Sequence, residues 1–184
     1  NAQKVQAEQL HLSKDVTQAN ILLGQPGIAR SHPDYYAVMV MNYILGGGGF
    51  GSRLMDRIRE EKGYVYSIRS HFSARKHAGP FIVSLQTKNE SALQAIDETL
   101  AVIRRFIQEG ATEVELKAAK DYFINSFPLR LVSNRDVAGM LPVLEFYELG
   151  LDYPDRYANI IRAVTLEQVK AATKNHLKPD QFLQ

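Results

Sequence analysis

Apolar residues spaced by three and four positions predict most of the helices in this chain. The clearest run covers residues 89–110, where helical spacing continues until Gly110 interrupts it. Asn89 is a candidate N-cap for this helix, because asparagine side chains accept hydrogen bonds from exposed N–H groups at helix starts. The positions expected to face the core are Leu93, Ile96, Leu100, Ile103 and Ile107.

The same spacing predicts two helices on either side of a glycine run. The first has Pro33 in its opening turn and should end at the four consecutive glycines, Gly46 to Gly49. Ser52 is a candidate cap for the second, a short charged helix that Gly63 can close in the left-handed conformation. The core-facing positions are expected to be Tyr36, Met39, Val40, Tyr43, Ile44, Leu54, Met55 and Ile58, and the charged residues of the second helix should mostly face water.

Helices also fill the later part of the chain. Thr112 with Glu115, and Thr165 with Gln168, have the spacing of capping boxes. The predicted helices run over residues 112–127, 133–149, 153–164 and 165–175. In the second of these, the positions expected to face inward are Val137, Leu141, Leu144 and Tyr147.

Alternation with a period of two predicts strands in the first half. Tyr64 to Phe72 and Phe81 to Thr87 flank a turn that contains Gly79 and Pro80, so they form a predicted antiparallel hairpin. A strand over 16–23 should end at the turn cluster Gly24 to Gly27.

The order of these elements indicates the fold class. A further strand around Leu10 to Ser13 could precede the others, after a polar start over residues 3–9. Strands gather early and helices late, which favours an α+β fold over alternating parallel units. We expect one domain over residues 1–184, with an antiparallel β-sheet packed on one face by α-helices.

Composition is that of a globular chain and excludes several functions. Of 184 residues, 45% are hydrophobic and 23% are charged, which argues against disorder. The net charge of +2 forms no basic stripe, so nucleic acid is not an expected partner. No apolar run is long enough to predict a membrane span. The absence of cysteine excludes disulfides, thiolate metal sites and cysteine nucleophiles.

Two hydrogen-bond donors stand on either side of Gly63. Arg57 is near the end of the charged helix and Tyr64 begins the following strand, so both side chains could project from one end of the sheet. There they could grip a carbonyl oxygen or a developing oxyanion. The alternative is structural: Arg57 pairs with Glu61 one turn later, and Tyr64 is a half-buried strand aromatic.

Other chemical motifs are absent or lack their context. Gly46, Gly48 and Gly51 satisfy GxGxxG, but this motif follows a helix, whereas a dinucleotide fingerprint follows a strand. Ser52 does not lie in a GxSxG elbow, and no pair of carboxylates is singled out for acid-base work.

The sequence predicts no metal site and no catalytic residue in this chain alone. It has no HxxEH, the motif that places two histidines and a glutamate on one helix. The five histidines are scattered, and no two are four residues apart. His71 and His77 flank the hairpin turn and could approach each other, but solvated turn residues are the favoured interpretation.

Residues 44–68, ILGGGGFGSRLMDRIREEKGYVYSI, resemble a segment of the pitrilysin or insulinase-like zinc metallopeptidases, which include the mitochondrial processing peptidases. In that family the unit belongs to the half that does not hold zinc. The resemblance implies that Arg57 and Tyr64 contact a peptide substrate bound at the partner half's zinc. It also implies that the run Gly46, Gly47, Gly48 and Gly49 helps to handle substrate.

The resemblance also implies partners. The chain would be a fragment that binds no cofactor and is inactive alone, with zinc held by a domain or subunit that carries HxxEH. The partner could belong to the same polypeptide or to another, and a homodimer of fragments is a further option. A periplasmic or secreted location is favoured over a cytoplasmic one. The alternative function is a non-catalytic scaffold or assembly subunit of the same fold.

Overall fold

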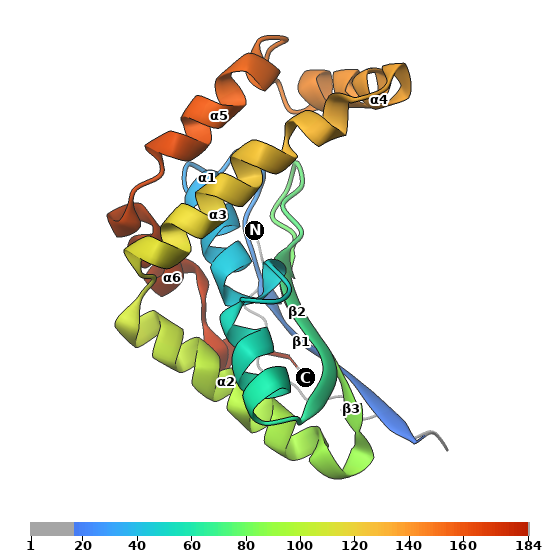
Figure 1. Ribbon diagram of the computed structural model, residues 1–184, viewed down its shortest axis with the longest axis vertical. Helices are drawn as coiled ribbons and strands as arrows, with labels where there is room; N and C mark the ends of the chain where they lie inside the picture. The colour runs from blue at the N-terminus through green and yellow to red at the C-terminus, as the bar shows by residue number, and fades with distance from the viewer. Residues whose placement is uncertain (1–16, 184) are drawn as a thin grey trace.

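The computed structural model describes residues 17–183, which form an antiparallel sheet and a set of helices (Figure 1). The strands are β1 (Gln18–Pro26), β2 (Val65–Phe72) and β3 (Pro80–Lys88), in the spatial order β1-β3-β2. The polar start, the strand expected around Leu10 to Ser13 and the first residue of the strand predicted over 16–23 lie outside the described residues.

Strand β1 is longer than the sequence predicts. Instead of ending at Leu23, it continues through Gly24 to Pro26, which pairs with Pro80 of β3. Gln25 is buried there, where its amide donates to the His176 carbonyl and accepts from the Lys178 N–H. Long-range pairing and these hydrogen bonds override the local turn propensity of the Gly-Gln-Pro sequence.

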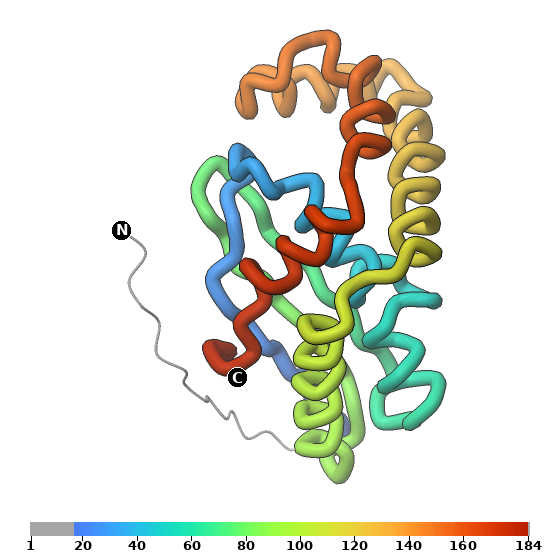
Figure 2. The backbone as a smooth tube through the Cα atoms, turned by 90° about the vertical axis from the view of Figure 1, so that its left-hand side faces the viewer, coloured from blue at the N-terminus to red at the C-terminus, as the bar shows by residue number. Residues whose placement is uncertain are grey.

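One face of the sheet carries the core. In β3, buried side chains alternate with partly exposed ones. Figures 1 and 2 show the helices on one side of the sheet, so the predicted α+β arrangement is confirmed. The buried residues of β3 are Phe81, Val83, Leu85 and Thr87.

The helix before the glycines differs from its prediction at both ends. Helix α1 (Tyr35–Asn42) begins two residues after Pro33 and continues as a π-helical segment, η1 (Tyr43–Gly47). The first two glycines therefore belong to the helix and do not end it. The charged helix that follows is also π-helical over η2 (Met55–Glu61), and Gly63 closes it with φ +63° as predicted.

Helix α2 (Ala92–Glu109) confirms the strongest helical prediction, with a different start. A 3₁₀ turn, η3 (Asn89–Ser91), precedes it, so Asn89 does not occupy its N-cap position. Leu93 is exposed because it lies in the first turn, beyond the part of the helix that contacts the core.

Four further helices complete the fold: α3 (Glu113–Ser126), α4 (Asn134–Phe146), α5 (Tyr153–Ala163) and α6 (Leu166–His176). Both predicted capping boxes form, at α3 and α6, and Ser133 with Asp136 makes a third at α4. Within the described range, no helix is long and apolar enough to cross a membrane.

Helix α4 contradicts its predicted inward face. Val137 and Leu141 are 45% and 49% exposed, and Leu144 is the one buried residue of the helix. Figure 1 shows the reason: α4 projects from the end of α3, away from the sheet. Its apolar stripe therefore meets little of this chain's own core.

Candidate functional site

The glycine run begins with a close approach between helix and strand. A Cβ atom at Gly46 would lie 2.7 Å from Leu54 Cδ1 and 2.7 Å from Ser70 Oγ, so a larger residue cannot fit without a shift. Asn42 secures this contact by accepting from the Ser70 hydroxyl at 2.8 Å. Packing against β2 is thus a structural reason for glycine here, whether or not the run also contacts substrate.

The second half of the run forms a tight reversal. Gly49 and Gly51 have positive φ angles of +66° and +86°, which glycine adopts without strain. The Ser52 hydroxyl donates to the Gly49 carbonyl at 2.7 Å, so Ser52 does not cap the next helix as predicted. Asp56 instead accepts from the Gly51 N–H at 3.1 Å and ties the reversal to η2.

Arg57 is held by two carboxylates. Its Nε donates to Glu98 of α2 at 2.8 Å, and its Nη1 donates to Glu61 at 2.5 Å. The predicted pairing with Glu61 is present, and the contact with Glu98 was not foreseen because the two residues are 41 positions apart. The hydrogen bonds that Arg57 donates, to Glu61 first and then to Glu98, raise the pKa of Arg57.

The third nitrogen of Arg57 remains available for a ligand. Within the described part of the chain, Nη2 makes no hydrogen bond, although a guanidinium has five N–H donors in a planar fork. The side chain is 32% exposed. Glu61 and Glu98 therefore fix the plane of the guanidinium while one edge of it stays accessible.

Arg57 lines a polar groove between η2 and α2. The groove has a volume of about 240 Å³ and contains both acidic and basic side chains. Asp56 and Glu61 are exposed while Arg53 and Arg57 are partly buried, so the prediction that the charged residues of this helix mostly face water is confirmed. The lining residues are Arg53, Asp56, Arg57, Glu61, Val102, Arg105 and Glu109.

Arg53 anchors the end of this groove to α3. Its guanidinium makes a two-pronged contact with Glu115, from Nε at 2.6 Å and from Nη2 at 2.9 Å, and lies 4.6 Å from the centre of the Phe106 ring. Glu115 also closes the Thr112 capping box. Burial would raise the pKa of Glu115, but hydrogen bonds from Arg53 and Thr112 hold it below its ordinary value.

Tyr64 lies just before β2 and is half-buried against the core. Its N–H donates to the Ile58 carbonyl at 3.0 Å, and its carbonyl accepts from the Thr87 hydroxyl. The backbone is therefore fixed at both sides of the residue. No hydrogen bond to the phenol hydroxyl occurs among residues 17–183, so this donor, like Arg57 Nη2, is available.

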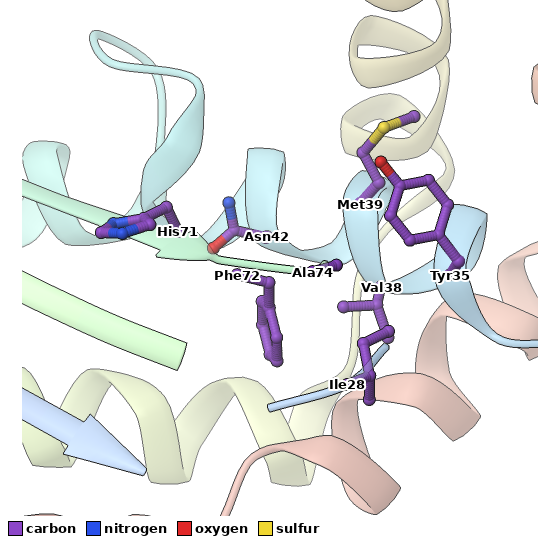
Figure 3. Close-up of a pocket in the computed structure, with 8 residues that line it drawn as sticks. All are labelled: Ile28, Tyr35, Val38, Met39, Asn42, His71, Phe72 and Ala74. Carbon is purple, nitrogen blue, oxygen red and sulfur yellow. The ribbon is translucent and has the colours of Figure 1, made fainter. Parts of the chain in front are cut away.

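A separate small pocket lies between α1 and the end of β2 (Figure 3). Its volume is about 100 Å³ and its wall is mostly apolar. Figure 3 shows His71 and Asn42 at one side, and Tyr35 with Met39 at the other. Such a pocket holds one side chain at most, since sites for larger ligands span several hundred Å³. The remaining lining residues are Ile28, Val38, Phe72 and Ala74.

The histidines that come together in the fold are His32 and His176, a pair that the sequence did not predict. His71 and His77 are both exposed, whereas His32 and His176 meet at Asp34, 142 residues before His176. No local spacing could reveal that cluster. It does not fit the catalytic zinc of a metallopeptidase, because it has no helix-borne pair of histidines and no glutamate beside them to serve as base.

Comparison with known proteins places this chain and its fold in a family. The family model described as the peptidase M16 inactive domain matches residues 1–123. A Helicobacter pylori protein named non-peptidase homolog YmxG is 34% identical over 171 residues, which cover 90% of this chain and 38% of that protein. A Bacillus subtilis protein named uncharacterized zinc protease YmxG is 30% identical over 179 residues, or 96% of this chain and 43% of that protein.

A solved structure agrees with these sequence matches. The crystal structure of a peptidase M16 inactive domain from Pseudomonas fluorescens has a TM-score of 0.89 and 37% identity, covering 97% of this chain and 42% of that one. The chain spans about two fifths of the length of the curated relatives it matches. Since the family model covers more than half of the sequence, the chain belongs to the peptidase M16 inactive-domain family, the non-catalytic half of zinc-protease homologues.

Proposed function

We propose that this domain completes the peptide-binding chamber of a zinc metallopeptidase and positions substrate for hydrolysis at a zinc ion in a partner half. The observation that carries the proposal is the state of Arg57: two carboxylates hold its guanidinium, it lines a polar groove, and its Nη2 makes no hydrogen bond within residues 17–183. A side chain oriented in this way loses little freedom when a peptide carbonyl binds to it.

Arg57 and Tyr64 have related tasks in this proposal. Zinc in the partner half supplies the activated water and polarises the scissile carbonyl. The Arg57 Nη2 and the Tyr64 hydroxyl donate hydrogen bonds to the peptide and to the oxyanion that develops during attack. Fixed donors aimed at a developing charge lower the barrier, because they need no reorganisation when the charge appears.

The glycine run has a supporting task. Gly49 has open space around its Cα, and no atom lies within 4 Å of a Cβ built there. An extended peptide can therefore approach this backbone closely. Gly46 has a packing role instead. Within the run we therefore assign substrate contact to its second half, which forms the reversal.

The exposed apolar residues distributed around α4 support a partner half as the structure that covers them. We define the α4 surface as Leu141, Val143 and Phe146, which are 49%, 41% and 55% exposed. A helix of 13 residues with one buried side chain gains little from its own chain, and short helices are marginal alone. About three fifths of the length of these relatives lies outside the matched region, which is chain enough for a second half, and we assign the covering of this surface to that half.

A scaffold function is the second candidate. The H. pylori relative, at 34% identity, is named a non-peptidase homolog. In that case the domain would bind its partner through the α4 surface, and Arg57 would serve only to join η2 to α2.

The test combines this chain with a zinc-bearing half that carries HxxEH. Hydrolysis of an unstructured peptide mixture is measured for each half alone and for both together. We expect hydrolysis only from the combination, and Leu141→Asp in the α4 surface should weaken association at least tenfold without unfolding the domain. Association without hydrolysis would favour the scaffold, and hydrolysis by the zinc-bearing half alone at the full rate would contradict the proposal.

A further inference from the structure

We propose that His32, Asp34 and His176 form a binding site for a divalent cation of the zinc class. Their ligand atoms all lie within 4.8 Å of one another, although the residues come from the loop before α1 and from the end of α6. Two imidazoles and one carboxylate match the nitrogen and oxygen ligands that Zn²⁺ accepts.

The ligand atoms gather around one oxygen of Asp34. His176 Nε2 lies 2.7 Å from Asp34 Oδ2, and His32 Nδ1 lies 4.0 Å from the same oxygen. His32 Nδ1 accepts a hydrogen bond from the Asp34 N–H at 3.0 Å, so the ring must turn its lone pair away from this N–H to bind an ion. Ligand atoms of a tetrahedral zinc ion stand about 3.3 Å apart. The distances of His176 Nε2 and His32 Nδ1 from Asp34 Oδ2 would therefore each change by less than about 1 Å.

The backbone around the cluster is fixed before any ion binds. Buried Gln25 donates to the His176 carbonyl at 2.8 Å and accepts from the Lys178 N–H at 2.7 Å, which holds the end of α6 against β1. On the other side, the His32 carbonyl accepts from the Tyr35 N–H at 2.9 Å as α1 begins. Binding would thus order few groups, and three protein ligands leave the fourth coordination position to water.

The expected consequence is stability. The ion would join the start of α1 to the end of α6 in the folded state, and unfolding would separate two ligands from the third by 142 residues of chain. A ligand that binds only the folded protein raises the unfolding temperature by mass action.

The test uses the untagged 184-residue chain freed of metal with a chelator. Addition of Zn²⁺ at about a hundred times its dissociation constant should raise the unfolding midpoint by about 5 °C or more. His32→Ala and His176→Ala should each abolish this rise, while His71→Ala and His77→Ala, at exposed histidines, should leave it unchanged.

Cobalt provides an independent readout of the site itself. Co²⁺ should bind with one-to-one stoichiometry and give the visible absorption of a four-coordinate site, in the wild type and in the His77→Ala control. His176→Ala also removes the hydrogen bond to Asp34, so His32→Ala, which leaves that bond in place, decides between metal binding and simple packing. No rise in midpoint with Zn²⁺, or an equal rise in His32→Ala, would overturn the proposal.

Discussion

Arg57 of η2 donates from Nε to the carboxylate of Glu98 on α2 at 2.8 Å, and this bond sets the plane of the guanidinium. Glu61 accepts from Nη1 of the same group, so two of the three nitrogens are held, while Nη2 makes no hydrogen bond in the described part of the chain. The pairing and the predicted substrate contact are therefore compatible. The acidic partners determine where the open edge of Arg57 points.

Replacing Glu98 should affect turnover more than stability. Glu98→Gln keeps the shape of the side chain but weakens its hold on Arg57, and a partly exposed ion pair contributes about 1 kcal/mol or less to the free energy of unfolding. In the assembled peptidase we expect kcat to fall about tenfold, because the donor is no longer held in place. Asp97→Asn, at the exposed neighbouring position of α2, is the control. Wild-type kcat in Glu98→Gln would show that this contact does not position Arg57.

Removing the Tyr64 hydroxyl isolates its chemical contribution. Tyr64→Phe preserves the ring that packs on the core and the backbone bond to Ile58, so the free energy of unfolding should change by less than about 0.5 kcal/mol. Peptide hydrolysis should fall about a hundredfold if the phenol donates to the oxyanion. The matched control is Tyr66→Phe, at an exposed position of β2. Equal rates for the two variants would assign Tyr64 a purely structural part.

Glycine-to-alanine substitutions should have opposite effects on stability at a crowded and at an open position. Gly46→Ala places a methyl group 2.7 Å from Leu54 Cδ1 and Ser70 Oγ, and we expect a loss of about 1–3 kcal/mol in the free energy of unfolding. Gly139→Ala, in α4 with no atom within 4 Å of the added Cβ, should instead stabilise by about 0.5–1 kcal/mol. Urea unfolding measures both. An unchanged Gly46→Ala would mean that η1 moves away from β2 at little cost.

The lowered pKa of Glu115 predicts that the protein becomes less stable as the pH falls. Despite burial, hydrogen bonds from Arg53 and Thr112 lower its pKa in the folded state. A lowered folded-state pKa contributes stability that is fully present above the ordinary pKa and is lost as the pH falls through the lowered value. Denaturant unfolding of the wild type and Glu115→Gln should therefore differ at neutral pH and converge between about pH 5 and pH 3. A constant difference over that range would contradict the assignment.

The sequence predicted those parts of the fold that local chemistry determines. The Thr112 and Thr165 capping boxes, the closing role of Gly63 and the hairpin of β2 and β3 all depend on residues close in sequence, and each is confirmed. Alternating polarity also located β2 and β3, because strands with one buried face alternate.

The errors occurred where distant segments decide the outcome. Pairing with β3 extends β1 through a sequence that favours a turn, and the packing of Gly46 on Ser70 keeps the glycine inside a helix. Helix α4 has the apolar pattern of a core helix, but within the described residues Leu144 is its one buried side chain.

The same limit applies to the candidate site. The pairing of Arg57 with Glu61 lies within one helical turn and was foreseen, whereas Glu98 and the cluster at Asp34 come together only through the fold. The substrate contacts of Arg57 and Tyr64 came from family resemblance and stay a prediction.

The most direct test of the account compares kcat/KM for Arg57→Ala and Arg59→Ala in the assembled peptidase. Arg59 is on the same helix and is similarly exposed. Within the described residues its one ion pair is with Glu60, and its guanidinium lies 5.1 Å from the centre of the Phe50 ring, so it controls for lost charge. Substrate positioning by Arg57 predicts a fall of about a hundredfold or more in Arg57→Ala and less than about twofold in Arg59→Ala. Equal kcat/KM values for the two variants would contradict the central claim.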